Sequence, residues 1–208
     1  QWALPNQPAN SGVPAWSPDH QWLAFRSDAS GAWQVYKIRP DGSDLTQLTS
    51  EGQNFEPNWS PDGSQILFVS DRDGNKELYL MDADGGGQTR LTFNDVVDDD
   101  PSFSPYGDAL VFESKRDEHM DVYWMALNNP SEQIRVTSGG VYNGTPAWSP
   151  DGQYILYERQ EGSQTHLWLI YTSDWTTTQY TFLGELNHRP AWSWDGQSVA
   201  YTSDESGG

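Results

Sequence analysis

Residues 57–92 read PNWSPDGSQILFVSDRDGNKELYLMDADGGGQTRLT, and this stretch decides the fold. Its short apolar runs, such as those at 66–68 and 78–80, alternate with turn sequences such as the Pro-Asp-Gly at 61–63. Proline presets the φ angle of a turn and glycine supplies a positive φ, so each such sequence ends one strand and allows the next to begin. The stretch therefore predicts four short antiparallel strands.

The same pattern occurs five times along the chain. Each repeat opens with a proline followed by an aromatic residue and a serine, and successive repeats start 43 to 45 residues apart. A period of about 44 residues with four strands per unit is typical of β-propeller blades. We therefore predict an all-β, five-bladed β-propeller of four-stranded antiparallel blades. The repeats start at Pro14, Pro57, Pro101, Pro146 and Pro190.

The two ends of the chain each supply part of a blade. Residues 190–208 contain two strands of a fifth unit, and residues 2–4 lie before Pro14 at the spacing of a fourth strand. We therefore predict that residues 1–13 form a closing strand that completes this incomplete blade, so that residues 1–208 make one β-propeller domain. The slot of a missing third strand exposes an unpaired edge, which predicts self-association through the fifth blade.

The composition excludes several classes of protein. The chain has 11 Lys and Arg against 30 Asp and Glu, which gives a formal net charge of -19, and it has no Cys. This charge repels the phosphate backbone of nucleic acids. Disulfides, thiolate metal sites and cysteine nucleophiles are ruled out, and no run approaches the roughly 18 apolar residues of a membrane helix. We therefore expect neither nucleic-acid binding nor membrane insertion.

Repeat two carries four motifs in a fixed order. They are Trp-Ser-Pro-Asp-Gly at 59–63, Ile-x-Phe-x-Ser-Asp-Arg-x-Gly at 66–74, Leu-Tyr-x-Met-x-x-Asp-Gly at 78–85, and Leu-Thr at 91–92. This order resembles the TolB-type, WD40-like (PD40) propeller repeat, and the resemblance covers essentially the whole chain. Such repeats occur in periplasmic and secreted proteins and in propellers attached to serine peptidases, so the resemblance implies a periplasmic or extracellular location.

Sequence motifs of catalysis are missing from the chain. It contains no Gly-x-Ser-x-Gly nucleophile elbow and no His-Glu-x-x-His metal motif, and the three glycines at 85–87 lack the strand-to-helix setting of a phosphate loop. We therefore predict no catalytic residue, and we expect a protein that is not an enzyme.

Acidic and amide residues stand just before the recurrent proline of each repeat. In a propeller these fourth-to-first strand connections converge on the mouth of the central channel. Glu56, Asp98 and Asp100 supply the carboxylate oxygens that Ca²⁺ prefers, so they are our candidate calcium ligands. The alternative is a solvated acidic rim that holds no ion.

Four other side chains are candidates for contact with a partner. Trp33 and Trp175 stand where other repeats have polar or turn residues, and exposed aromatic residues often mark binding surfaces. Asn143 and His188 lie in the same connections as the candidate calcium ligands. We expect Asn143 and His188 to lie near the channel mouth, and Trp33 and Trp175 to be exposed on a binding surface.

These features predict a non-catalytic binding or assembly module of a secreted or periplasmic protein. Protein partners would dock on the face made by the fourth-to-first and second-to-third strand connections. Two alternatives stay open. One is a carbohydrate-binding or carbohydrate-active propeller that uses channel-mouth acids such as Glu56 and Asp98, with Trp33 as a sugar platform; the other is an accessory propeller of a serine peptidase.

Overall fold

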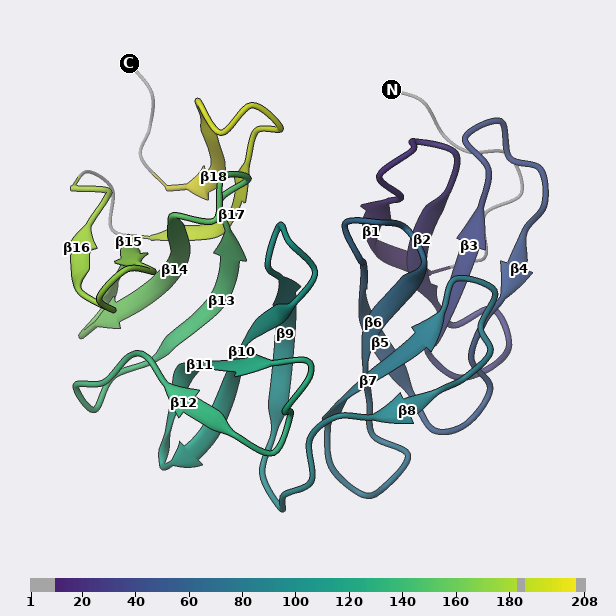
Figure 1. Ribbon diagram of the computed structural model, residues 1–208, viewed down its shortest axis with the longest axis horizontal. Coiled ribbons are helices and arrows are strands. Elements are labelled where there is room, and N and C mark those ends of the chain that lie inside the picture. Colours follow the sequence, from purple (N-terminus) through teal and green to yellow (C-terminus); the bar gives the residue numbers. More distant parts are fainter. Residues whose placement is uncertain (1–9, 183–185, 205–208) are drawn as a thin grey trace. The chain divides into compact units, whose positions relative to one another are not determined.

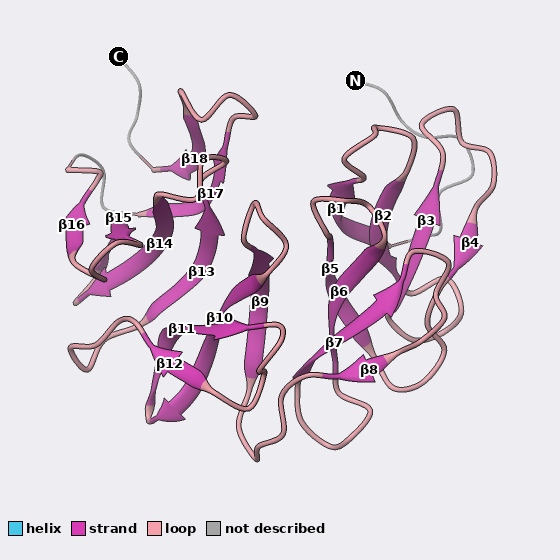
Figure 2. Ribbon diagram, in the orientation of Figure 1, coloured by secondary structure: helices cyan, strands magenta, loops and turns pink. Residues whose placement is uncertain are grey.

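The computed structural model describes residues 10–182 and 186–204, and its chain forms two compact units, residues 1–101 and 102–208 (Figure 1). The described residues form strands, turns and loops only, which confirms the all-β prediction (Figure 2). Within this part of the chain, no helix is present that could cross a membrane. The single-domain prediction depends on how the two units sit together and stays a prediction.

The first two blades lie in the first unit, and each is a four-stranded antiparallel sheet in sequence order. The second and third strands occupy the runs expected from the sequence, whereas the fourth strands are only two residues long. Blade 1 contains β1 (Ser11–Trp16), β2 (Leu23–Ser27), β3 (Gln34–Ile38) and β4 (Thr46–Gln47), and blade 2 contains β5 (Asn54–Trp59), β6 (Gln65–Ser70), β7 (Glu77–Asp82) and β8 (Thr89–Arg90).

Three further sheets follow along the chain. The third and fourth sheets again have four strands, and the fifth has two, which confirms five blades with an incomplete last one. Blade 3 contains β9 (Asp98–Phe103), β10 (Ala109–Asp117), β11 (His119–Ala126) and β12 (Gln133–Arg135); blade 4 contains β13 (Asn143–Trp148), β14 (Tyr154–Glu161), β15 (Gln164–Tyr171) and β16 (Thr177–Gln179); blade 5 contains β17 (Asn187–Trp192) and β18 (Val199–Ser203). Of the predicted closing strand, residues 1–13, residues 1–9 lie outside the described residues, whereas residues 11–13 belong to β1 of blade 1.

The first strand of each blade differs from the prediction. It begins three residues before the recurrent proline, so the residues expected to form a connection belong to the strand. The residue directly before the proline has a positive φ of 44° to 52°, and the pairing register shifts there in blades 1, 2, 4 and 5. A β-bulge explains both observations, because it inserts one unpaired residue into the ladder. The residues with this φ are Val13, Glu56, Asp100, Thr145 and Arg189.

The core lies within and between successive blades. In each of the first three blades an aromatic residue of the second strand packs against one of the third strand, with ring centroids 5.6 to 5.9 Å apart. Trp59 of blade 2 is buried in one cluster with Ala24 and Val35 of blade 1. Trp59 therefore joins blade 2 to blade 1.

The Pro-Asp-Gly turns are fixed by a recurring serine. In blade 2 the Ser60 hydroxyl donates to the Asp62 carboxylate at 2.6 Å and accepts from the Gln65 amide at 3.0 Å. The serine hydrogen bond, followed by one from the backbone amide two residues after the aspartate, holds the pKa of this carboxyl group below its usual value of 3.8. The same shift, from the same causes, occurs at Asp19, Asp151 and Asp195.

These turns predict an acid-sensitive fold. A carboxyl group with a lowered folded-state pKa stabilises the protein above its unfolded-state pKa, and this contribution is lost as the pH falls through the folded-state value. We expect the free energy of unfolding to decrease as the pH falls below about 4. Asp62→Asn should make that decrease smaller, as measured by urea unfolding at a series of pH values. Equal pH dependence in both proteins would contradict this account.

Candidate binding face

Backbone hydrogen bonds gather several loops of the first unit at one end of its sheets. The Asn54 amide donates to the Trp33 carbonyl at 2.8 Å, and the Asp98 amide donates to the Lys76 carbonyl at 3.0 Å. The second-to-third strand turns therefore lie beside the fourth-to-first connections. We call this the connection end, and it consists of residues 28–33, 49–56, 71–76 and 94–100.

Aromatic and cationic side chains alternate across the connection end. The Arg26 guanidinium lies 5.1 Å from the ring centroid of Trp33 and 5.8 Å from that of Phe55. The Lys76 ammonium lies 5.0 Å from the same Phe55 ring on the next blade. These distances are within the range of cation–π attraction. We call Trp33, Arg26, Phe55 and Lys76 the aromatic–cation row.

Carboxylates hold both cations of the row in place. Arg26 Nη1 lies 3.1 Å from Glu56 Oε1, and Lys76 pairs with Asp99. The side chains of Arg26 and Lys76 are 29% and 35% exposed, so each keeps part of its polar group at the surface. The result is a half-buried surface of aromatic rings and fixed charges. Tryptophan and arginine are enriched among the residues that carry most of the binding energy in protein interfaces.

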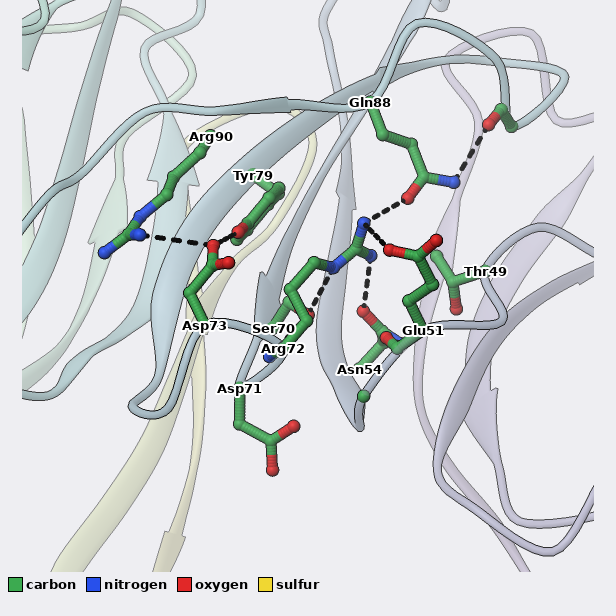
Figure 3. Close-up of polar contacts among 12 residues, drawn as sticks. Thr49, Glu51, Asn54, Ser70, Asp71, Arg72, Asp73, Tyr79, Gln88 and Arg90 are labelled. Carbon is green, nitrogen blue, oxygen red and sulfur yellow. Dashed lines mark hydrogen bonds and ion pairs between the residues drawn. The ribbon is translucent and has the colours of Figure 1, made fainter.

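Arg72, from the Ser-Asp-Arg-x-Gly motif, fixes the connection that carries Phe55 (Figure 3). Its guanidinium donates to Ser70 at 2.9 Å, to Gln88 at 2.8 Å and to Asn54 at 3.1 Å. It also lies 4.6 Å from the ring centroid of Tyr79. Arg72 therefore ties two loops of blade 2 to the first residue of β5, which sets the position of the bulge at the connection end.

Asp73 and Tyr79 complete the group drawn in Figure 3. The Tyr79 hydroxyl donates to the Asp73 carboxylate, and Arg90 lies 3.2 Å from that carboxylate. Burial, and after it the hydrogen bond to Asp73, raises the pKa of Tyr79 to about 12. The hydroxyl is therefore a hydrogen-bond donor at any physiological pH, which suits a structural role.

In blades 2 to 5 the first residue of the first strand is buried. These residues therefore do not line a solvent-exposed channel mouth. Asn143, our candidate for contact with a partner, is fully buried and donates to Asp121 at 2.9 Å. Asp98, our candidate calcium ligand, is also fully buried and accepts from Asn94 at 2.7 Å. The bulge turns these side chains inward, so neither is presented at the surface. The equivalent buried residues are Asn54 and Asn187.

In the second unit, glutamates of the second strand accept from the bulge of the next blade. Glu113 accepts from the Thr145 amide at 3.1 Å, and Glu158 accepts from the Arg189 amide at 2.6 Å. His188, another candidate for partner contact, lies with Nδ1 2.9 Å from Glu158 and keeps 42% of its side chain exposed. In blade 1 the position of Glu113 and Glu158 is taken by Arg26. Here the second strand supplies the donor, and Glu56 of the next bulge is the acceptor.

The two candidate tryptophans have different surroundings. Trp33 is half-buried in the aromatic–cation row, where it contacts Arg26. Trp175 is also half-buried, but its ring lies 6.1 Å from that of Trp124 and packs on the core cluster of the second unit. The sequence reasoning missed Arg26, Phe55 and Lys76. One feature of the sequence could have indicated Arg26: the second strand has arginine at this position in blade 1 and glutamate in blades 3 and 4.

The proposed calcium ligands do not form a cluster in the described part of the chain, where no group of three or more His, Asp or Glu side chains is placed to hold a metal ion. Glu56 is paired with Arg26, and Asp98 is buried. Calcium binding by Glu56, Asp98 and Asp100 therefore stays a prediction. A melting temperature that rises with Ca²⁺ concentration up to the millimolar range would support it.

The repeat and blade geometry agree with comparisons to known proteins. Residues 49–208 match the sequence model of the TolB beta-propeller domain. The chain belongs to this TolB propeller family. A search of curated protein sequences found no match.

Solved structures of this family are similar over almost the whole chain. TolB from Acinetobacter baumannii is 26% identical with a TM-score of 0.81, and the match covers 95% of this chain and 49% of that one. A putative TolB from Agrobacterium tumefaciens is 24% identical, also with a TM-score of 0.81, over 93% of this chain and 70% of that one. This propeller chain thus spans about half the length of the Acinetobacter protein.

A likeness to an enzyme is also present at the level of the fold. An oligogalacturonate lyase in complex with manganese is 18% identical with a TM-score of 0.73, over 92% of this chain and 58% of that one. At this identity the likeness concerns the fold alone, and activity has to be argued from the residues of the site.

Proposed function

We propose that this TolB-family chain is a non-catalytic binding module of a periplasmic or extracellular protein, and that protein partners dock at the connection end of the first unit. The aromatic–cation row carries this proposal. Its rings are held by cations, and its cations are held by Glu56 and Asp99, so the surface is ordered before a partner arrives. Preorganisation of this kind lowers the entropic cost of association.

The proposal predicts that binding depends on two rings of the row. Affinity capture from extracts of the source cells should yield a partner whose dissociation constant is then measured by calorimetry. Trp33→Ala and Phe55→Ala should each weaken this binding about thirtyfold, which corresponds to roughly 2 kcal/mol for an interface hot spot.

Tyr106→Ala is the matched control for this experiment. Tyr106 is 74% exposed and follows Pro105 in the first-to-second strand turn of blade 3, far in sequence from the row. Its removal should leave the dissociation constant unchanged. A partner that binds all three variants with wild-type affinity would exclude the connection end as its docking site.

A carbohydrate ligand is the second candidate, and the same row favours it. Aromatic faces stack on sugar rings, and Arg26 and Lys76 would pair with the carboxylates of an acidic sugar. Titration with oligogalacturonates, followed by tryptophan fluorescence in wild-type protein and Trp33→Ala, separates this candidate from a protein ligand. A saturable response that Trp33→Ala abolishes would favour the sugar.

A further inference from the structure

Two tryptophans meet between blades 3 and 4 of the second unit. The rings of Trp124, in β11, and Trp175, in the turn between β15 and β16, have centroids 6.1 Å apart. Both residues are half-buried, so part of each side chain is at the surface. Ile134 of β12 lies directly opposite Trp124 and is 41% exposed. We call Trp124, Ile134 and Trp175 the tryptophan patch.

Trp175 stands at a turn position that glycine holds in blades 1 and 2. In all three turns an aspartate accepts from the amide two residues later at 2.9 to 3.0 Å, and the residue between them has a positive φ. A bulky side chain rarely adopts this conformation, and strained residues of this kind cluster at functional sites. The turn alone therefore does not account for a tryptophan. The residues between are Gly42 (φ 87°), Gly85 (φ 94°) and Trp175 (φ 59°).

Half-buried tryptophans outside the recurrent Pro-x-Trp motif are otherwise covered by a cation of the chain. Three of them have a guanidinium or ammonium group within 5.1 Å of the ring centroid, which is the range of cation–π attraction. Among the described residues, no lysine or arginine covers Trp124 or Trp175 in this way. The covered rings are Trp33 (by Arg26), Trp168 (by Arg159) and Trp22 (by Lys37 and Arg39).

The charges beside the patch favour a cationic ligand. The hydrogen bond from the Thr176 hydroxyl, followed by one from its amide, holds the pKa of the Asp174 carboxyl group below its usual value of 3.8. A negative charge therefore stands directly before Trp175 at neutral pH. Arg135, which follows Ile134, pairs with two aspartates of blade 3 and points to the opposite face of β12. The net charge of -19 acts in the same direction.

We propose that the tryptophan patch binds an arginine side chain from a basic segment of a partner protein. The guanidinium stacks on the Trp175 ring, Asp174 supplies the opposite charge, and apolar neighbours of the arginine cover Ile134. Arginine fits better than lysine, because its planar guanidinium stacks on rings and is more weakly hydrated. The patch belongs to the second unit, so the proposal does not depend on docking at the connection end of the first.

The test follows the indole N–H signals of protein labelled with ¹⁵N-tryptophan, assigned by replacing one tryptophan at a time with phenylalanine. The probe is the peptide acetyl-Leu-Arg-Leu-amide, and its control carries citrulline, a neutral side chain of the same shape. We expect saturable shifts of the Trp124 and Trp175 signals, with the arginine peptide binding about threefold to thirtyfold more tightly. The Trp22 signal should not move, because Lys37 and Arg39 already cover that ring.

Three protein variants provide a second arm. Trp175→Gly should abolish the shift of the Trp124 signal, and it should fold, because glycine holds this position in blades 1 and 2. Asp174→Asn keeps an acceptor for the Thr176 amide but removes the charge, so it should weaken peptide binding about threefold. Trp33→Ala, at the connection end, should bind the peptide with wild-type affinity.

Three results would overturn the proposal. The first is no shift, or equal affinity for the arginine and citrulline peptides. The second is binding that Asp174→Asn and a folded Trp175→Gly leave unchanged, which would place the peptide elsewhere. The third is a shift of the same two signals by cellohexaose at lower concentration than by the peptide, which would make the patch a sugar platform. If Trp175→Gly does not fold, Asp174→Asn and the citrulline peptide decide.

Discussion

Replacing Asp121 with alanine should lower the free energy of unfolding by about 3 kcal/mol, because it leaves two buried hydrogen-bond donors without their acceptor at a cost of about 1–3 kcal/mol each. Asp121 is fully buried at the start of the third strand of blade 3. Its carboxylate accepts from Thr137 at 2.8 Å and from Asn143 at 2.9 Å, and it pairs with Arg135. The alanine variant leaves two buried donors and a cation without this acceptor.

Asp121→Asn is the matched control, because it keeps one oxygen acceptor and the same volume. Blade 1 shows that an amide can fill this role, since Gln34 accepts from Thr49 at 2.7 Å and from Asn54 at 2.8 Å. We expect a loss of only about 1–2 kcal/mol, from the weaker interaction with Arg135. Urea unfolding measures both values. Equal losses would show that charge, and not the acceptor oxygen, determines the stability of this network.

The blades could be predicted from the sequence because they depend on local patterns. The runs at 66–68 and 78–80 alternate with Pro-Asp-Gly and Asp-Gly turns, and the structure places β6 and β7 there. Each turn residue acts through its own φ preference, so the pattern needs no knowledge of distant contacts. Because the repeat occurs five times, the same local pattern predicts all five blades.

The candidate site could not be predicted in the same way, because it depends on a conformation that the residue types disfavour. A residue before proline usually avoids the α regions, yet Glu56 has a φ of 47°. This bulge turns Asn54 into the core and leaves Glu56 beside Arg26. The row joins residues from four different loops and strands, so no single stretch of sequence contains it.

Gly52→Ala should destabilise the protein by about 3 kcal/mol and should also weaken binding at the connection end. Gly52 has a φ of +62°, and a Cβ atom there would lie 2.8 Å from the backbone nitrogen and Cα of Arg72. The left-handed conformation costs about 1–2 kcal/mol for a residue with a Cβ, and overpacking adds about 1–3 kcal/mol. Arg72 cannot move away freely, since Ser70, Gln88 and Asn54 hold its guanidinium.

Gly74→Ala separates the two contributions in this prediction. Gly74 also has a positive φ, +109°, but nothing lies within 4 Å of its Cβ position. Its variant should therefore lose only the conformational part, about 1–2 kcal/mol, in urea unfolding. The steric part at Gly52 can be relieved only by moving the 49–56 connection, which carries Phe55 of the row. Gly52→Ala should thus reduce partner binding at temperatures where it remains folded, whereas Gly74→Ala should not. If the two variants lose the same stability and bind alike, Arg72 does not hold this connection in place.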